Sequence, residues 1–220
     1  MRPRIHLVHA YRFSMAPCEE AFQRLWPEAE AIRLLDEGLY ADAGADGTLP
    51  ANIVPRLNSL FRHCVLSGAA GIVFTGSTFG PAVEAAKSGI TIPLLKADEA
   101  MGELAVRRGK RILMLATGKR AIPVIRRNLE DAAKAAGVAP ELGEVWVEHA
   151  QAANNAGRAA EHDSLIADAA ARHGNGWDAI VLGQMSMAPA CARMPADLAA
   201  RVLTSPDASA LKMRELLGKA

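Results

Sequence analysis

The segment Gly71–Ala82, with the sequence GIVFTGSTFGPA, constrains the fold more than any other part of this chain. It begins with the apolar, partly β-branched run Ile72–Phe74, which predicts a short buried strand. Small hydroxyl-bearing residues follow in Thr75–Thr78, and a Gly-Pro pair then leads into AVEAAK, a sequence typical of a helix with a first-turn proline. A strand, a small polar loop and a helix start together predict an anion site, because they offer N–H groups, hydroxyls and a partial positive charge.

A second copy of this pattern lies in the other half of the chain. Ile72–Ala82 (IVFTGSTFGPA) aligns without a gap on Ile180–Ala190 (IVLGQMSMAPA) at an offset of 108 residues, and Arg4–Val8 aligns on Arg111–Leu115 at an offset of 107. Two matches in the same order and at nearly the same offset favour an internal duplication. The alternative is that both segments are ordinary strand–turn–helix units of an α/β protein.

Strand and helix patterns alternate along the chain, which predicts the α/β class with parallel sheets. With the repeat, the expected architecture is two pseudo-symmetric lobes, each a mainly parallel sheet flanked by helices, facing each other across a cleft. The first lobe is expected at 1–95 plus 205–220 and the second at 96–204. The expected strands are Ile5–Ala10, Glu30–Leu35, Ile72–Phe74, Thr91–Leu95, Arg111–Ala116, Val145–Val147, Ala179–Leu182 and Arg201–Leu203.

Three further segments carry specific predictions. Asp36–Pro50 holds three glycines and several small or acidic residues, which predicts a loop long enough to serve as a lid. Gln151–Ala160 predicts a polar loop. Ser205 is expected to cap a helix over Asp207–Leu217, with Pro206 at its first position.

Charge and cysteine content exclude several classes of function. The chain has 25 basic and 24 acidic residues, and a net charge of +1 gives no electrostatic basis for binding nucleic acid or an anionic membrane. The three cysteines, Cys18, Cys64 and Cys191, have no CxxC or metal-type spacing, so we expect reduced, buried thiols in a cytoplasmic protein. No apolar run reaches transmembrane length, and the N-terminal residues predict a strand rather than a signal-peptide core.

The first repeated loop holds four residues expected to bind substrate. Thr75, Ser77 and Thr78 can donate hydrogen bonds to a carboxylate, and Gly76 lies among them. The alternative role for the hydroxyls is to cap the next helix.

The second loop offers the equivalent positions. Ser186 takes the place of Thr78, Met185 precedes it, and Gln184 stands opposite Gly76 in the repeat alignment. Gln184 can either hydrogen-bond a substrate or satisfy the loop backbone as a structural amide.

His9 is the ionisable residue best placed for proton transfer. It ends the first expected strand, at the edge where α/β proteins place their chemistry, and a reference pKa of about 6.5 suits an acid or base. The alternative is a packed or capping histidine, and Tyr11 is a further hydrogen-bond donor. The six histidines form no HxH or HExxH pattern, and the chain has neither a P-loop nor GxGxxG, so neither a metal nor a nucleotide cofactor is predicted.

Five segments of the chain, FTGSTFGPAVEAA, IPLLKADEAM, RILMLATG, DAIVLGQMSMA and LTSPDA, resemble the aspartate/glutamate/hydantoin racemase superfamily. The resemblance covers nearly the whole chain and implies a cofactor-independent enzyme of two α/β lobes that holds a substrate carboxylate among loop N–H groups and hydroxyls. In the family, a cysteine in each lobe's loop moves a proton on one face of the substrate. The resemblance also implies that Thr117 touches the ligand, and it allows a homodimer. Lys119 and Arg120 are nearby cations for an acidic substrate; the alternative is that they are solvated surface charges.

The chain departs from the family pattern at both cysteine positions, which hold Gly76 and Gln184. Neither residue can act as a thiolate base, because glycine has no side chain and an amide does not titrate. We therefore predict cofactor-independent proton transfer on a small carboxylic acid in the cleft, as an isomerase or a decarboxylase without the cysteine pair. The alternatives are a catalytically silent carboxylate-binding protein and a protein with an unrelated ligand. The candidate catalytic residues are His9, Ser77, Gln184 and Ser186.

Overall fold

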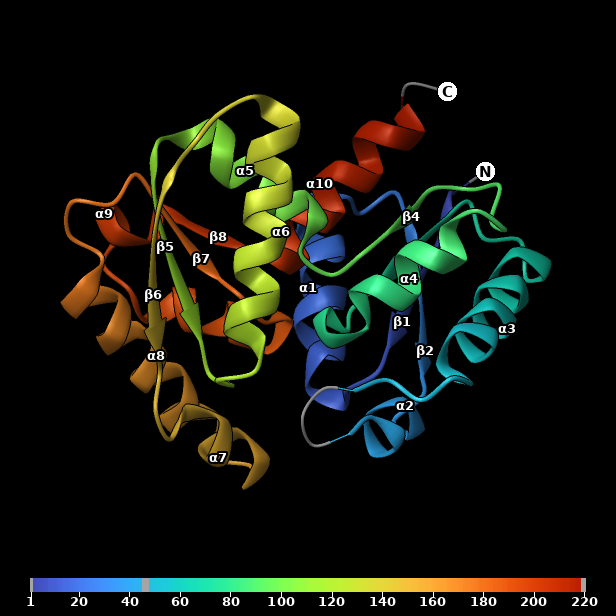
Figure 1. Cartoon of the computed structure of the whole chain (residues 1–220), viewed down its shortest axis with the longest axis horizontal. Helices are drawn as coiled ribbons and strands as arrows, with labels where there is room; N and C mark the ends of the chain where they lie inside the picture. Colours follow the sequence, from blue (N-terminus) through green and yellow to red (C-terminus); the bar gives the residue numbers. More distant parts are fainter. Residues whose placement is uncertain (1, 45–47, 219–220) are drawn as a thin grey trace. The chain divides into compact units, whose positions relative to one another are not determined.

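The structure, a computed structural model, describes residues 2–44 and 48–218 and confirms the predicted α/β class. It contains two four-stranded parallel sheets, with strand orders β2-β1-β3-β4 and β6-β5-β7-β8 (Figure 1). The contacts divide the chain into two compact units. Unit 1 extends to Ala97 and takes up the chain again from Ser209, and unit 2 is Asp98–Ala208.

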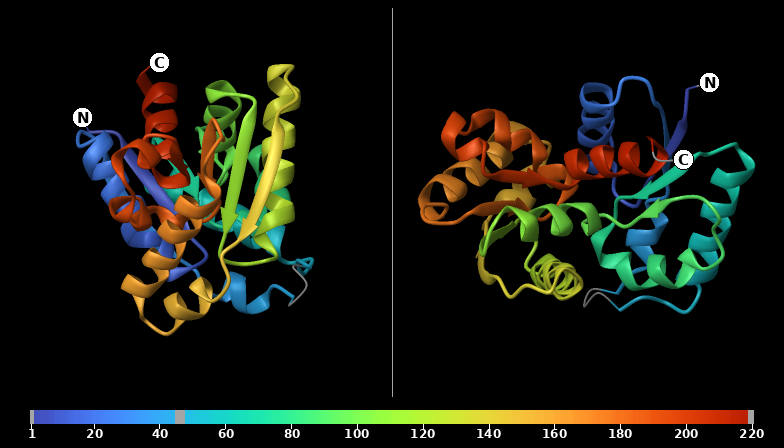
Figure 2. Two further views of the ribbon diagram at one scale, coloured as in Figure 1. Left: turned by 90° about the vertical axis from the view of Figure 1, so that its left-hand side faces the viewer. Right: turned by 90° about the horizontal axis from the view of Figure 1, so that it is seen from above.

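Unit 1 is a sheet covered by helices on both faces (Figure 2). On one face, α3 and α4 pack Phe61 and Val83 against Phe74 of the central strand. On the other face, Met213 of α10 lies so close to Gly71 that a Cβ there would come within 2.5 Å of its sulfur. The elements are β1 (Arg4–His9), η1 (Arg12–Ser14), α1 (Met15–Leu25), β2 (Glu30–Leu35), α2 (Gly38–Asp42), α3 (Ile53–Leu66), β3 (Gly71–Phe74), η2 (Ser77–Phe79), α4 (Gly80–Lys87), β4 (Leu94–Leu95) and α10 (Ser205–Gly218).

Unit 2 repeats this layering. Helices α5 and α6 bury Met101 and Leu129 against one face of its sheet, and Ile166 of α8 and Met187 of η3 pack on the other. The elements are α5 (Glu99–Arg108), β5 (Arg111–Ala116), α6 (Ala121–Ala136), β6 (Glu141–Trp146), α7 (Ala150–Asn155), α8 (Ala159–His173), β7 (Ala179–Leu182), η3 (Met185–Arg193), α9 (Ala196–Ala199) and β8 (Val202–Thr204).

The strand registers reproduce the offsets of the sequence repeat. Ile5 pairs with Gly71 in unit 1, and Ile112 pairs with Ala179 in unit 2, so equivalent residues differ by 107 in β1 and β5 and by 108 in β3 and β7. Even the ion pair between the first residues of neighbouring strands recurs, as Arg4–Glu30 and Arg111–Glu141, each at 3.0 Å. The two units are therefore structural repeats, and Gly76 is the equivalent of Gln184.

Two segments predicted as loops contain short helices. Within Asp36–Pro50, the Asp36 carboxylate accepts the N–H of Gly38 and binds Arg56, and this fixes the start of α2. The predicted lid includes residues 45–47, which lie outside the described residues. The prediction for Gln151–Ala160 is wrong at its start, because alanines of α7 pack into the core of unit 2 and tertiary burial overrides the polar composition.

The predicted cap of the last helix is also wrong. The helix α10 begins at Ser205 itself, and the hydroxyl of Thr204 accepts the N–H of Asp207 at 3.4 Å. The Ser205 hydroxyl instead donates to the buried carboxylate of Asp98 at 2.6 Å. A buried carboxylate gains more from this donor than a helix start does, because it has lost its hydration.

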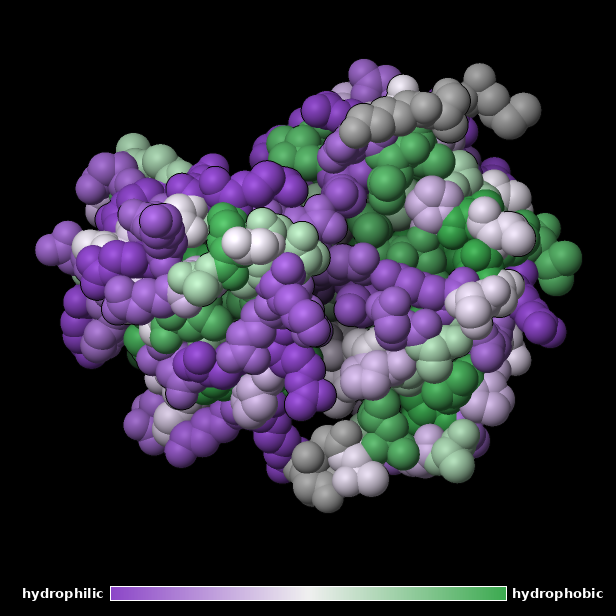
Figure 3. All heavy atoms as spheres, turned by 45° about the horizontal axis from the view of Figure 1, so that its top comes forward, coloured by the Kyte–Doolittle hydropathy of each residue, from purple (hydrophilic) through white to green (hydrophobic). Residues whose placement is uncertain are grey.

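No helix in the described part of the chain is both long and apolar enough to cross a membrane. On the face of the molecule drawn in Figure 3, charged and polar side chains lie beside broad apolar areas.

Candidate functional site

The loop after β3 is set by the sheet on one side and by a helix on the other. The N–H of Thr75 still donates to Val8 of the neighbouring strand at 3.0 Å, so the chain leaves the sheet only at Gly76. The turn η2 follows, with the N–H of Phe79 donating to the carbonyl of Gly76, and α4 then begins with Pro81 in its first turn, as predicted. The loop therefore lies at the carboxyl end of β3 and at the amino end of a helix.

Three successive residues of this loop have backbone N–H groups that make no hydrogen bond with the described residues. Among the residues that the structure describes, those of Gly76, Ser77 and Thr78 form no hydrogen bond, nor does the Ser77 hydroxyl. The Thr78 hydroxyl lies 3.4 Å from that of Tyr40, a residue of α2. Consecutive free N–H groups beside hydroxyls suit an anion, and a carboxylate in particular.

Beneath the loop, His9, Ser14 and Thr75 form a buried hydrogen-bonded triangle. Nδ1 of His9 lies 2.8 Å from the Ser14 hydroxyl and 3.0 Å from that of Thr75, and the two hydroxyls are 2.9 Å apart. The Ser14 hydroxyl also reaches the carbonyl of Tyr11 at 2.6 Å, which can only accept, so Ser14 donates there and accepts from the other two. The hydroxyl of Thr75 is thus engaged inside the protein.

This setting favours a neutral His9. The residue is fully buried, and burial lowers its pKa to about 4, with a smaller contribution from the charge of Arg33. Its Nε2 has no hydrogen-bond partner among the described residues. Near neutral pH, His9 is therefore a neutral imidazole rather than an imidazolium acid, and it is only a weak base, which supports the packed-histidine alternative.

The position of Gly76 has no room for a side chain. A Cβ there would lie 2.9 Å from ring atoms of both Phe74 and Phe79 and 3.2 Å from Cβ of Ala10. The two rings are fully buried and meet edge to face, with centroids 5.9 Å apart. The space that a cysteine would need in unit 1 is thus filled by aromatic side chains.

In unit 2, Gln184 leaves β7 as Gly76 leaves β3, and both residues have extended backbone before a 3₁₀ turn. Its side-chain oxygen accepts three hydrogen bonds from the loop after β5: from the N–H of Thr117 at 2.7 Å, the Thr117 hydroxyl at 3.0 Å and the N–H of Gly118 at 3.3 Å. This is the structural-amide alternative. The structure thus brings Thr117 and Gln184 together, as it does His9 and Thr75.

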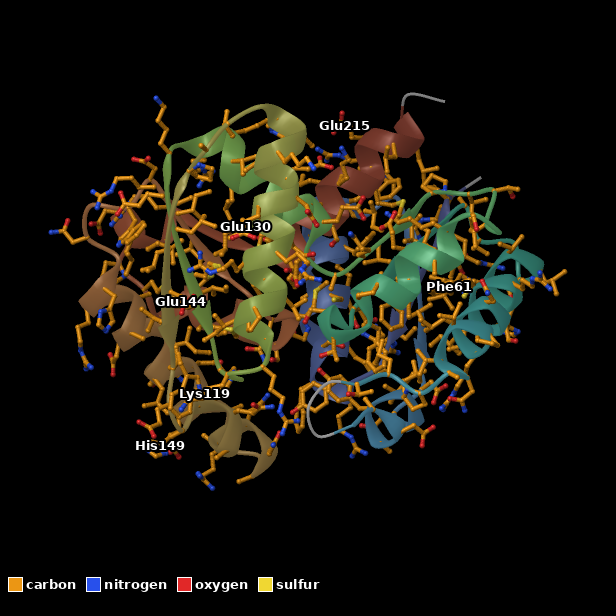
Figure 4. The ribbon with its side chains drawn as sticks, in the orientation of Figure 1. Phe61, Lys119, Glu130, Glu144, His149 and Glu215 are labelled. Atoms are coloured by element: carbon orange, nitrogen blue, oxygen red, sulfur yellow. The ribbon has the colours of Figure 1, made fainter. Side chains whose placement is uncertain are left out.

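The remaining predicted residues differ in exposure. Ser186 is half-buried, whereas Met185 is almost fully buried in η3. The Lys119 ammonium lies over the Trp146 ring, 3.9 Å from its centroid. Lys119 lies in the chain just after the carboxyl end of β5, and His149 just after that of β6 (Figure 4). Arg120 is exposed at the start of α6.

None of the three cysteines occupies the key position of either loop, because these positions hold Gly76 and Gln184. Cys18 and Cys64 are buried in α1 and α3, where burial raises the pKa of both thiols, that of Cys64 to about 11. Cys191 is partly exposed in η3. In the part of the chain that the structure describes, no group of three or more His, Cys, Asp or Glu residues could hold a metal ion.

Sequence reasoning missed Ser14 and Tyr40. Ser14 follows His9 by five residues, and nothing in that spacing indicates that a turn folds its hydroxyl back onto the imidazole. Tyr40 precedes Thr78 by 38 residues in a segment predicted as a loop. Their contacts depend on η1 and α2, neither of which has a clear sequence pattern.

Comparisons with known proteins agree with this architecture. A family model described as Asp/Glu/Hydantoin racemase matches residues 16–213. The fold is similar to allantoin racemase from Klebsiella pneumoniae (18% identity, 99% of this chain and 88% of that chain, TM-score 0.72) and to the aspartate racemase of Picrophilus torridus (12%, 98% and 94%, 0.71). It is also similar to unliganded arylmalonate decarboxylase (14%, 98% and 93%, 0.60). A search of curated proteins gave no match.

Proposed function

Because the chain belongs to the Asp/Glu/hydantoin racemase family, we propose that it binds a small carboxylic acid at the loop after β3 without the family's two-thiol proton transfer. The observation that carries the proposal is the row of N–H groups of Gly76, Ser77 and Thr78, which make no hydrogen bond among the described residues. A carboxylate oxygen accepts such bonds strongly, because the acceptor is charged and the donors are already oriented.

Among the residues that the structure describes, the donors identified at this loop are neutral. They are the three N–H groups and the hydroxyls of Ser77, Thr78 and Tyr40. An enzyme that moves an α-proton needs an ionisable group within reach of the substrate, whereas a binding site needs only donors. This arrangement supports binding over catalysis.

Two features argue against two-thiol chemistry. Phe74 and Phe79 fill the space beside Gly76, and the oxygen of Gln184 is engaged by Thr117 and Gly118. The cleft between the lobes, the identity of the acid, a cytoplasmic location and a homodimer stay predictions from the sequence. The names of similar structures suggest hydantoin-like rings, amino acids and substituted malonates as a ligand panel.

A second candidate function is proton transfer by His9, as an isomerase or a decarboxylase. Its support is that Nε2 of this ring has no partner among the described residues while Nδ1 binds Thr75 next to the loop. A base with a pKa of about 4 is fully deprotonated above about pH 5, so such an activity would fall as the pH drops through about 4.

Titration calorimetry and backbone-amide NMR with this panel test the proposal. At least one acid should bind and shift the amide signals of Gly76, Ser77 and Thr78. A matched control is Ser59→Ala, which removes an exposed hydroxyl of α3 that donates to a carbonyl of its own helix and should leave binding unchanged. If no acid on the panel shifts the three amides, the proposal is wrong.

A further inference from the structure

The loop after β5 in unit 2 already holds an oxygen in an anion-type cradle. Three donors converge on Oε1 of Gln184: two successive N–H groups, of Thr117 and Gly118, and the Thr117 hydroxyl, at distances between 2.7 and 3.3 Å. Oxygen rather than nitrogen is required at this position, because the two N–H groups can only donate. An amide oxygen is the neutral counterpart of one carboxylate oxygen.

The surroundings hold these donors in place. The carbonyl of Thr117 accepts the indole N–H of Trp146 at 3.1 Å, which fixes the orientation of the peptide. At Gly118, a Cβ would lie 2.9 Å from the side-chain oxygen of Gln151, so only glycine fits without displacing that side chain. The ammonium of Lys119 and the amino end of α6 add positive charge close by.

Gly76 and Gln184 occupy equivalent positions, but the donors around them lie in loops that are not equivalent, after β3 in unit 1 and after β5 in unit 2. In unit 1, Gly76 has no side chain and the loop's N–H groups make no hydrogen bond among the described residues. In unit 2, the side chain of Gln184 reaches the neighbouring loop and fills its cradle.

We infer that Gln184 is a built-in ligand that closes a second carboxylate cradle, made by Thr117 and Gly118, and so leaves the chain with one open carboxylate site. The count of one open site rests on the function proposed above, while the closed cradle of unit 2 stands on its own hydrogen bonds. Gln184 thereby acts as a specificity-determining residue: of these two sets of donors, only the one after β3 is open to a carboxylate.

Three substitutions of Gln184 test whether its side chain fills a carboxylate-binding cradle or only packs in the loop. Gln184→Gly removes the built-in oxygen and opens the cradle, and Gln184→Ala is a second opening variant should the glycine variant fail to fold. Gln184→Glu is nearly isosteric and supplies a carboxylate oxygen of its own, so it keeps the cradle closed.

The probe is sodium acetate, titrated at constant ionic strength with sodium chloride and followed by the amide signals of Thr117 and Gly118. In the unaltered protein and in Gln184→Glu, these two signals should not respond. In Gln184→Gly or Gln184→Ala they should shift saturably, with a change in apparent affinity of at least about tenfold over the unaltered protein. A saturable response in the unaltered protein, or none in a folded opening variant, overturns the inference.

A measurement without any substitution provides a second test. A scalar coupling across the hydrogen bond should connect the Thr117 amide nitrogen with the side-chain carbonyl carbon of Gln184, and its absence would contradict the closed cradle. The amides of Gly76, Ser77 and Thr78 report separately on the proposed function. If they ignore every acid on the panel while Thr117 and Gly118 behave as expected, the proposed function fails and the count of one open site fails with it, while the closed cradle of unit 2 stands.

Discussion

Restoring the family's first cysteine should destabilise this protein. In Gly76→Ala or Gly76→Cys, the new Cβ would lie 2.9 Å from ring atoms of Phe74 and Phe79. Carbon atoms normally pack at about 3.5–4.0 Å, so both rings must move, and neither has a solvent-exposed side toward which to turn.

The expected loss in the free energy of unfolding is the balance of two opposed effects. Overpacking a filled core costs about 1–3 kcal/mol, whereas replacing a glycine stabilises by about 0.4–1 kcal/mol through the unfolded chain. The φ of −109° at Gly76 is accessible to any residue, so backbone strain adds nothing. We expect a net loss of about 1–2 kcal/mol for Gly76→Ala, or roughly 2–8 °C in Tm, and more for the larger cysteine.

Chemical and thermal denaturation measure this loss. The matched control is Gly80→Ala at the first residue of α4, where a Cβ would meet nothing within 4 Å and stability should hold or rise. In a Phe79→Leu background, Gly76→Ala should cost less, since one of the two rings is gone. The packing argument would be refuted if Gly76→Ala were as stable as Gly80→Ala. It would also be refuted if Gly76→Ala lowered the free energy of unfolding equally with and without Phe79→Leu.

Two further predictions concern the cluster beneath the loop and the loop itself. The folded protein keeps His9 neutral down to about pH 4, whereas in the unfolded chain this histidine takes up a proton at about pH 6.5. The free energy of unfolding should therefore fall by up to about 3 kcal/mol as the pH drops from about 6.5 to about 4. Denaturation of His9→Asn over the same pH range should show a correspondingly smaller fall. An equal fall in both proteins would contradict the burial of a neutral ring. Replacing Ser77 by alanine, which removes a hydroxyl that makes no hydrogen bond among the described residues, should weaken carboxylate binding by about 1.5–3 kcal/mol in calorimetry, and unchanged affinity would show that the anion-loop assignment is wrong.

Much of the fold follows from the sequence because its central strands are continuous apolar runs. The central strands Arg111–Ala116 and Ala179–Leu182 have the predicted bounds, as does the edge strand Glu30–Leu35, and the repeat offsets reappear in the strand pairing. The edge strand predicted at Thr91–Leu95 is shorter in the structure: β4 is only Leu94–Leu95, because the proline before it cannot donate a ladder hydrogen bond. The helix α7 depends on burial of its alanines in unit 2, which local polarity does not reveal.

The candidate site was predictable in position but not in character. The repeat alignment placed Gly76 opposite Gln184, and the structure gives them equivalent backbone positions. What the sequence could not decide was the role of His9 and Gln184, because that depends on contacts with Ser14 and Thr117 made across the fold. The crowding at Gly76 likewise arises from Phe74 and Phe79 meeting around it, which no linear pattern encodes.

The central claim is that this racemase-family chain binds a small carboxylic acid but does not exchange its α-proton. The most direct test incubates the protein in heavy water with amino acids, hydantoins, maleate and substituted malonates, and follows the α-signals by NMR beside a binding measurement on the same acids. The account predicts an acid that binds while no deuterium enters its α-position and no malonate loses carbon dioxide. Deuterium entering a bound acid, or decarboxylation, would contradict it and favour proton transfer, with His9→Asn as the next variant.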